Sequence, residues 1–473
     1  MPASGYRASD ATEPPGAGEK TEKTARLLLL HQHPSPNIQP ILFRPFQPSR
    51  HGSNMFRHVH KYEKWSQNLS FHTKKKSNSP DKHFSTPECP LRRKEFLPEY
   101  FSSWNLLAKN MPSLVQGNRM RHEVDKMPLL DHQHLQGHRQ KRLAHLQLTI
   151  IASGYVWQHG DKDASKSIPK SIAVPLYYLS EELGLPPIVC HPSLALANWA
   201  PLFPDRPLCL ENLRCLYTLP GGAEAEWFFL TTVMVELTFG KCIQSILSVV
   251  TSTKEENEGQ AIQGLSHIAD VVKQMEEVLS HMHDKLTSGT FFNVLRPYLG
   301  GYGGESSPLP EGVVFEGISD QPIKAFGGSA AQSATLQVLD ALLGIQHTDG
   351  EKSFLMTMRT YMPPSHRQFV EAIENKSHSV RKFVECSNNS DLHKAYNTCL
   401  SAVARFRSYH IQIVTKYIIQ ARANKTTGKR FESLDNKGTG GTNLMPFLKT
   451  LRQDTMAKLV PSDNTQNGKS ADN

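Results

Sequence analysis

The sequence has few cysteines, no paired cysteine motif and no long apolar run, and each absence excludes a class of protein. The seven cysteines in 473 residues form no CxxC pair, which argues against a cysteine-built zinc site and against a secreted disulfide framework. The leucine run at 27–30 is four residues long, whereas about 20 apolar residues are needed to cross a bilayer. No apolar segment of secretory length lies near Met1. We therefore expect a cytoplasmic protein with reduced thiols and no membrane-embedded part.

The positive charge is concentrated at the N-terminal end. Of the net charge of +9, residues 1–100 carry +7. A nucleic-acid-binding domain has its positive charge on a folded face, so we expect no nucleic-acid partner. Residues 1–96 hold 11 of the 31 prolines and no sustained apolar period, which predicts a disordered basic extension. A polybasic arm that binds nucleic acid or an acidic membrane is the alternative.

From residue 97 onward the apolar residues follow a helical spacing. No period-2 apolar runs alternate with crossover helices, so we predict an all-α fold and no doubly wound sheet. We expect a small, mainly helical lobe at 97–222, a large helical lobe at 223–458 and a disordered tail at 459–473. Helices are predicted at 103–115, 117–124, 138–153, 224–253, 259–287, 290–299, 330–346, 365–376, 378–386 and 391–422.

The segment 391–422 has the most informative pattern. Six residues follow one another at spacings of 4, 3, 4, 4 and 3, which places them on one helical stripe with a histidine in its middle. A histidine on a buried face needs hydrogen-bond partners or a metal. A core histidine with satisfied nitrogens is one interpretation. A haem ligand is the other, because the porphyrin supplies the remaining equatorial nitrogens. The six residues are Cys399, Val403, Phe406, His410, Val414 and Tyr417.

Several strings in the sequence resemble the indoleamine 2,3-dioxygenases, haem enzymes that open the indole ring of tryptophan. RSYHIQIVTKYI at 407–418 is similar to the proximal-histidine helix of that family. The resemblance continues in FFNVLRPYLGGY at 291–302, FGGSAAQSATLQVLDALLGI at 326–345 and KGTGGTNLMPFLKTLR at 437–452, and covers roughly residues 97–458. Thr232 and His191 resemble the second vertebrate paralogue most. The expected fold is the two-lobed, all-α fold of this family.

The resemblance implies a haem b dioxygenase whose iron is Fe²⁺ in the active state. Its substrates would be O2 and L-tryptophan or a related indoleamine, and its product N-formylkynurenine. His410 would be the proximal iron ligand, and Arg407, one turn earlier, could reach a haem propionate. We expect a monomer that relies on a cellular reductant. A haem-binding regulatory or interaction protein with weak or vestigial dioxygenase activity remains the alternative.

The resemblance also implies an aromatic substrate pocket with four catalytic positions, Thr232, Phe228, Phe291 and Arg296. Phe228 would lie beside the indole and Thr232 over the iron; four residues apart on a helix, they share a face. Phe291 and Phe292 would contact the substrate, and Arg296 would bind its carboxylate through two hydrogen bonds. Without the resemblance, Phe228 would be interpreted as ordinary core and Arg296 as a surface charge.

A glycine-containing turn and a second glycine-rich loop complete the expected site. Residues 327–330, here called the glycine turn, would lie against haem and substrate, because a backbone without Cβ atoms can approach a flat group closely. The loop 438–442 would be a lid over the substrate; it lacks the lysine of a phosphate-binding loop. His191 would line the pocket where some family members have tyrosine. The residues assigned to the turn are Gly327, Gly328, Ser329 and Ala330, with Ser329 and Ala330 on the haem, and those assigned to the lid are Thr439, Gly440 and Gly441.

Overall fold

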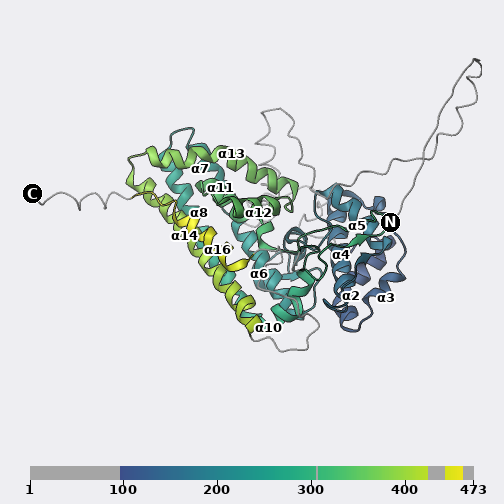
Figure 1. Ribbon diagram of the computed structural model, residues 1–473. Coiled ribbons are helices and arrows are strands. Elements are labelled where there is room, and N and C mark those ends of the chain that lie inside the picture. Colours follow the sequence, from purple (N-terminus) through teal and green to yellow (C-terminus); the bar gives the residue numbers. More distant parts are fainter. Residues whose placement is uncertain (1–95, 305–306, 424–442, 462–473) are drawn as a thin grey trace, which may run out of the picture. The chain divides into compact units, whose positions relative to one another are not determined.

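The computed structural model describes residues 96–304, 307–423 and 443–461, and their fold is almost entirely helical (Figure 1). The basic extension predicted for 1–96 lies outside the described residues except for Phe96, and so does the tail from 462 onward. The all-α prediction is confirmed: within the described ranges, the strands form two pairs of two or three residues each.

The first part of the fold is built from four helices: α2 (Ser102–Gln116), α3 (Met120–Asp125), α4 (Gly137–Trp157) and α5 (Lys170–Leu183). α2 packs on α4 through an apolar face that includes Trp104 and Met111. The close approach needs a glycine on α4, because a Cβ at Gly154 would lie 2.9 Å from Cγ of Met111.

One of two short strand pairs connects this part to a later segment of the chain. β1 (Ser167–Ile168) pairs in parallel with β4 (Val314–Phe315), and β2 (Trp199–Pro201) pairs antiparallel with β3 (Leu213–Cys215). Ser153 on α4 also donates a hydrogen bond to the carbonyl of Tyr298 at 2.8 Å. Contacts therefore cross the boundary expected near residue 222, and the division into two lobes stays a prediction.

The second part of the fold surrounds α14 (Ser390–Val414). α14 packs along α8 (Glu258–Ser280) and contacts α16 (Leu444–Met456) and α11 (Ala334–Leu343), as Figure 1 shows for the yellow-green and yellow helices. The remaining helices are α6 (Gly222–Gly240), α7 (Ile243–Ser252), α9 (Met282–Lys285), α10 (Ser288–Thr290), α12 (Asp349–Arg359), α13 (Pro364–Cys386) and α15 (Ala421–Ala423).

Some helix boundaries differ from the prediction for local reasons. The helix expected at 224–253 is interrupted at Lys241 and Cys242, where the Cys242 thiol donates to the carbonyl of Phe239 at 3.1 Å. The two helices expected between 365 and 386 form one helix, α13. α5, α12 and α16 were not predicted. α12 is amphipathic but buries only two residues, Met358 and Arg359.

One helical run, 222–252, is long and apolar enough to cross a membrane by length and composition alone. More than half of its most apolar window is buried inside the molecule, and it contains the interruption between α6 and α7. A helix of the protein core has the same properties.

Candidate functional site

His410 lies near the C-terminal end of α14, on the stripe that its spacing predicts. The other five members of the stripe are buried, whereas His410 is half-buried. α14 starts after Asn389, whose side chain accepts hydrogen bonds from the backbone N–H groups of Asp391 and Leu392. The stripe prediction is therefore confirmed, and the histidine is the member that keeps accessible surface.

The His410 ring makes no hydrogen bond within the described part of the chain. Burial, together with the positive charge of Arg407, lowers its pKa to about 4, so the imidazole is neutral near pH 7. A neutral ring nitrogen is the form that binds a metal. The alternative of a core histidine satisfied by protein hydrogen bonds therefore finds no support among the described residues, and the donor chemistry fits an axial haem ligand.

Arg407 is buried one turn before His410 and is held mainly by protein groups. Its Nη2 lies 2.7 Å from each carboxylate oxygen of Asp340, and its Nη1 donates to Leu451 O at 2.9 Å and to the Thr455 hydroxyl. Its Nε has no partner in the described part of the chain. Contact with a haem propionate thus stays a prediction, and Nε is the donor left for it.

Three aromatic rings from three elements meet beside α14. The centroid of Phe228 on α6 lies 5.1 Å from that of Phe291, and Phe291 lies 5.9 Å from Tyr417, edge to face. Tyr417 belongs to the same stripe as His410. The structure thus brings together Phe228 and Phe291, which sequence reasoning had assigned to the indole pocket. Packing of this kind favours a flat aromatic ligand.

Phe292 and Arg296 share a face, as predicted, but on an irregular helix. The guanidinium of Arg296 lies 5.3 Å from the centroid of the Phe292 ring, and both side chains are buried. The predicted helix at 290–299 is instead α10, followed by a π-helical turn at Phe291–Leu295 and a 3₁₀ turn at Arg296–Leu299. π-Helical turns are frequent at functional sites. A buried arginine also contradicts the interpretation of this residue as a surface charge.

Thr232 is half-buried on the same face of α6 as Phe228. Its hydroxyl donates a hydrogen bond to the backbone carbonyl of Phe228 at 2.9 Å. The hydroxyl proton is therefore engaged within the helix, which is a common arrangement for helical threonine. Thr232 in this conformation can accept a hydrogen bond from a ligand but does not donate one.

In the glycine turn, the two glycines have different roles. A Cβ at Gly327 would lie 2.0 Å from the carbonyl oxygen of Leu299, so glycine is required by the packing of one chain segment on another. At Gly328 the nearest atom to a Cβ would be 3.7 Å away, an ordinary contact. Only Gly328 therefore keeps the predicted space for a ligand.

The residues after the two glycines form a capped 3₁₀ turn instead of the start of a long helix. The Ser329 hydroxyl accepts from the N–H of Ala331 at 3.3 Å, and Ala330 is exposed. The helix predicted at 330–346 begins only at Ala334, after a second cap at Ser333. Binding of Ser329 and Ala330 to haem stays a prediction.

The predicted lid cannot be compared with the fold. Thr439, Gly440 and Gly441 lie outside the described residues, which end at Ala423 and resume at Asn443.

His191 makes a contact that sequence reasoning missed. Its Nε2 lies 3.0 Å from Oε1 of Glu236 on α6, one turn beyond Thr232, and both side chains are buried. The available signal was the one carboxylate within the apolar segment 227–240 of α6, at the spacing that continues the face of Phe228 and Thr232.

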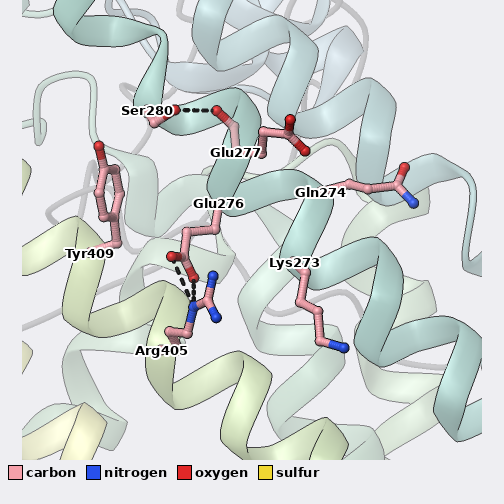
Figure 2. A pocket seen from close by; sticks show the side chains of 7 residues that line it. All are labelled: Lys273, Gln274, Glu276, Glu277, Ser280, Arg405 and Tyr409. Carbon is pink, nitrogen blue, oxygen red and sulfur yellow. Dashed lines mark hydrogen bonds and ion pairs between the residues drawn. The ribbon is translucent and has the colours of Figure 1, made fainter.

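A surface groove of about 380 Å³ lies between α8 and α14 but contains none of the predicted site residues (Figure 2). Some of its polar groups satisfy one another: Nε of Arg405 lies 2.8 and 3.0 Å from the two oxygens of Glu276, and Ser280 donates to Glu277 O. Tyr409 lines this groove, so it lies on a different face of α14 from its neighbour His410. We do not assign the site to this groove.

Comparison with known proteins agrees with this arrangement. The family model described as "Indoleamine 2,3-dioxygenase" matches residues 77–458. The chain belongs to the indoleamine 2,3-dioxygenase family.

Named relatives of this family cover most of the chain. A myoglobin of Haliotis madaka is 42% identical over 361 residues, 76% of this chain and 93% of its own. Indoleamine 2,3-dioxygenase 1 of Rattus norvegicus is 40% identical over 373 residues, 77% of this chain and 91% of its own. Indoleamine 2,3-dioxygenase 2 of Homo sapiens is 38% identical over 370 residues, 77% of this chain and 90% of its own. The family prediction is confirmed, but these identities do not separate the two paralogues.

The metal chemistry of a haem-containing family is compatible with the described side chains. Residues 96–304, 307–423 and 443–461 contain no group of three or more His, Cys, Asp or Glu that could hold a metal ion by itself. A single histidine without protein partners suffices only when a macrocycle supplies the other ligands. His410 meets that requirement.

Proposed function

We propose that this member of the indoleamine 2,3-dioxygenase family is a haem-dependent dioxygenase. It inserts O2 across the C2–C3 bond of the indole of L-tryptophan, or of a related indoleamine, and yields N-formylkynurenine. The observation that carries the proposal is His410, a neutral, half-buried imidazole without a hydrogen-bond partner among the described residues. Family membership supplies the reaction class.

The cofactor we propose is haem b with ferrous iron, bound through His410. Bound haem supplies the O2 and electron chemistry of the reaction. Arg407 supports this role by anchoring α14 to α11 and α16, through Asp340 and through Leu451 and Thr455. We further propose that a cellular reductant keeps the iron ferrous.

The side chains around the site bind and orient the substrate. Phe228 and Phe291 form a tilted pair of rings in contact with each other, against which a flat indole can pack. Stacking of this kind contributes roughly 0.5–1.5 kcal/mol per pair beyond area burial. Arg296 places a permanent positive charge beside Phe292, the next residue after Phe291, and we propose that it holds the amino-acid carboxylate. Ser329, Ala330 and Gly328 would approach the substrate or haem from the glycine turn.

None of the residues proposed for the distal side is a strong acid or base. The Thr232 hydroxyl donates its proton to its own helix, and the phenylalanines cannot exchange protons. The chain's contribution is therefore binding, orientation and exclusion of water. His191 and the 438–442 loop would complete the enclosure, with Thr439, Gly440 and Gly441 near the amino-acid end of the substrate.

A haem-binding protein with weak or vestigial dioxygenase activity is the second candidate. Two relatives at 42% identity favour it, because both are named myoglobin, a name that does not refer to catalysis. Thr232 points the same way, because its methyl group would crowd a tight pocket at a cost of roughly 1–3 kcal/mol.

The deciding experiment is turnover by reduced, haem-loaded protein given L-tryptophan and O2. We expect N-formylkynurenine, detected by mass spectrometry, together with consumption of O2. A haem-replete sample that shows a normal CO difference spectrum and forms no product would refute the enzyme and favour the second candidate. Comparison of full-length protein with a variant that lacks residues 1–96 shows whether the basic extension affects turnover.

We also propose that the protein acts as a cytoplasmic monomer with two lobes. The six cysteines within the described ranges are free thiols, as expected for a reducing compartment. Sedimentation of the purified protein tests the oligomeric state.

A further inference from the structure

Glu236 is a buried carboxylate that the proposed mechanism does not use. It lies on α6, one turn beyond Thr232, and its residue surface is 6% exposed. An ionised carboxylate in such a place is very unfavourable unless it is paired and hydrogen-bonded. Its partners therefore indicate what it does.

Three side chains from two other segments surround the Glu236 carboxylate. His191 Nε2 lies 3.0 Å from Oε1, Ser333 Oγ donates to the same oxygen at 2.5 Å, and Thr335 Oγ1 donates to Oε2 at 3.2 Å. Burial raises the pKa of Glu236, but the hydrogen bonds from His191 and Ser333 and the charge of His191 outweigh burial and lower it. The carboxylate is therefore ionised at neutral pH.

A second buried group, Gln332, connects the same two segments through the main chain. Its Oε1 accepts from the backbone N–H of His191 at 2.9 Å and from that of Ser329 at 3.3 Å, and its Nε2 donates to Gly327 O at 2.8 Å. The backbone of His191 is thus tied to the glycine turn by Gln332, and its ring is tied to the residues that follow the turn by Glu236. Two attachments fix both the place and the orientation of the ring.

The other charged groups near this pair do not compete for the histidine. Arg142 on α4 donates to Pro192 O at 2.7 Å. His366 on α13 is close to Glu236, but burial lowers its pKa to about 4, so it is neutral at physiological pH. His191 is the remaining titratable side chain beside Glu236, and its Nδ1 has no hydrogen bond within the described ranges.

We propose that Glu236 is a positioning residue of the substrate pocket, which holds the His191 ring against residues 327–335 so that Nδ1 faces the substrate. The inference rests on the proposed function, because that function places His191 and the glycine turn beside the indole. Glu236 touches neither substrate nor haem and acts through His191.

The test uses full-length, haem-loaded protein and steady-state turnover of L-tryptophan at pH 7. Glu236→Gln keeps the shape of the side chain and removes its charge. We expect KM to rise about tenfold, on the scale of a lost charge-assisted hydrogen bond, with little change in kcat. Glu226→Gln is the matched control: it lies on the same helix, accepts from Cys215 N at 2.8 Å, and should leave both KM and kcat unchanged.

A double-mutant cycle separates positioning from a general structural effect. In the His191→Ala background there is no ring to hold, so Glu236→Gln should not raise KM further. Full additivity would overturn the proposal, as would an unchanged KM in folded Glu236→Gln. If Glu236→Gln does not fold, Thr335→Val decides, since it removes one hydroxyl donor with little change of shape: a raised KM supports the role of Glu236, and an unchanged KM overturns it.

A measurement that needs no turnover distinguishes failure of this proposal from failure of the proposed function. If the wild-type protein turns over no tryptophan, the pair is followed instead by NMR of histidine-labelled protein. Glu236→Gln should move the ring signals of His191, and Glu226→Gln should not. Ring signals that stay in place would show that Glu236 does not hold the histidine.

Discussion

Arg407 and Asp340 form a buried ion pair in which one guanidinium nitrogen, Nη2, lies 2.7 Å from each carboxylate oxygen. The pair joins α14 to α11 one turn before His410. Asp340 also faces His347 Nε2 at 3.0 Å, and His347 Nδ1 lies 2.8 Å from Asp454 on α16. The contacts thus run from Arg407 to Asp340, then to His347 and to Asp454, and they link α14, α11 and α16. Burial raises the pKa of Asp340, but Arg407 and His347 outweigh it, so the pKa is lowered.

Asp340→Asn should strongly destabilise the fold. The substitution keeps the size of the side chain but leaves Arg407 buried without its counter-charge, which typically costs about 3–5 kcal/mol. Urea unfolding at pH 7 measures the loss. Asp349→Asn, an exposed change in the first turn of α12, is the control and should stay within about 0.5 kcal/mol of wild type. Equal midpoints for Asp340→Asn and wild type would contradict a stabilising ion pair.

His347 should make the stability of the protein fall as the pH rises above neutrality. Burial alone would lower its pKa, but the hydrogen bonds and charges of Asp340 and Asp454 raise it above 6.5. A group whose pKa is raised on folding stabilises fully below its unfolded pKa, and this contribution is lost as the pH rises through the folded value. Wild type should therefore lose stability relative to His347→Gln as the pH rises above about 6.5, the ordinary pKa of histidine. Parallel urea-midpoint curves for the two proteins would show that the histidine is not charged in the fold.

His410→Ala should abolish haem uptake. The substitution removes the imidazole that we propose as the axial ligand, and no group of metal-binding side chains in the described part of the chain can replace it. Absorption of the protein reconstituted with haem, reduced and exposed to CO, is the measurement. His393→Ala, on the same helix but bonded to Val384 O at 2.8 Å, should retain the spectrum. A normal Soret band in His410→Ala would assign the iron to another residue.

Much of the site follows from local sequence, because a helix repeats its faces regularly. The spacing around His410 predicted the buried stripe on α14, and the separation of four residues placed Phe228 and Thr232 on one face. Helical periodicity fixes such relationships before any tertiary contact forms.

The parts that the sequence did not reveal depend on packing between distant segments. His191 and Glu236 are 45 residues apart, and only the folded chain brings them to 3.0 Å. The π-helical turn at Phe291–Leu295 has the apolar pattern of an ordinary helix, so its geometry was not predictable. Gly327 was assigned to ligand approach, yet its lack of a Cβ is required by the carbonyl of Leu299. Sequence shows that a side chain is absent but not which neighbour needs the space.

Arg296→Ala should weaken binding of substrates that have a carboxylate. If the guanidinium pairs with that group, its loss costs roughly 1–3 kcal/mol, or about ten- to a hundredfold in KM. Tryptamine, which lacks the carboxylate, is the matched substrate: its turnover should be affected far less than that of L-tryptophan. An equal loss for both substrates would indicate that Arg296 supports the fold through its contact with Phe292 and does not read the carboxylate.

Substitution by alanine should lower the stability of the protein at Gly327 and should affect only substrate binding at Gly328. A Cβ at Gly327 would lie 2.0 Å from the carbonyl oxygen of Leu299 and 2.7 Å from Gly301 N, so the backbone must shift and the protein should unfold at a lower urea concentration. A Cβ at Gly328 meets nothing closer than 3.7 Å, so Gly328→Ala should keep wild-type stability. If the glycine turn lies against substrate, Gly328→Ala should nevertheless raise KM for L-tryptophan. A Gly328→Ala protein with unchanged stability and unchanged KM would remove the turn from the substrate pocket, because the only new atom would then meet neither protein nor ligand.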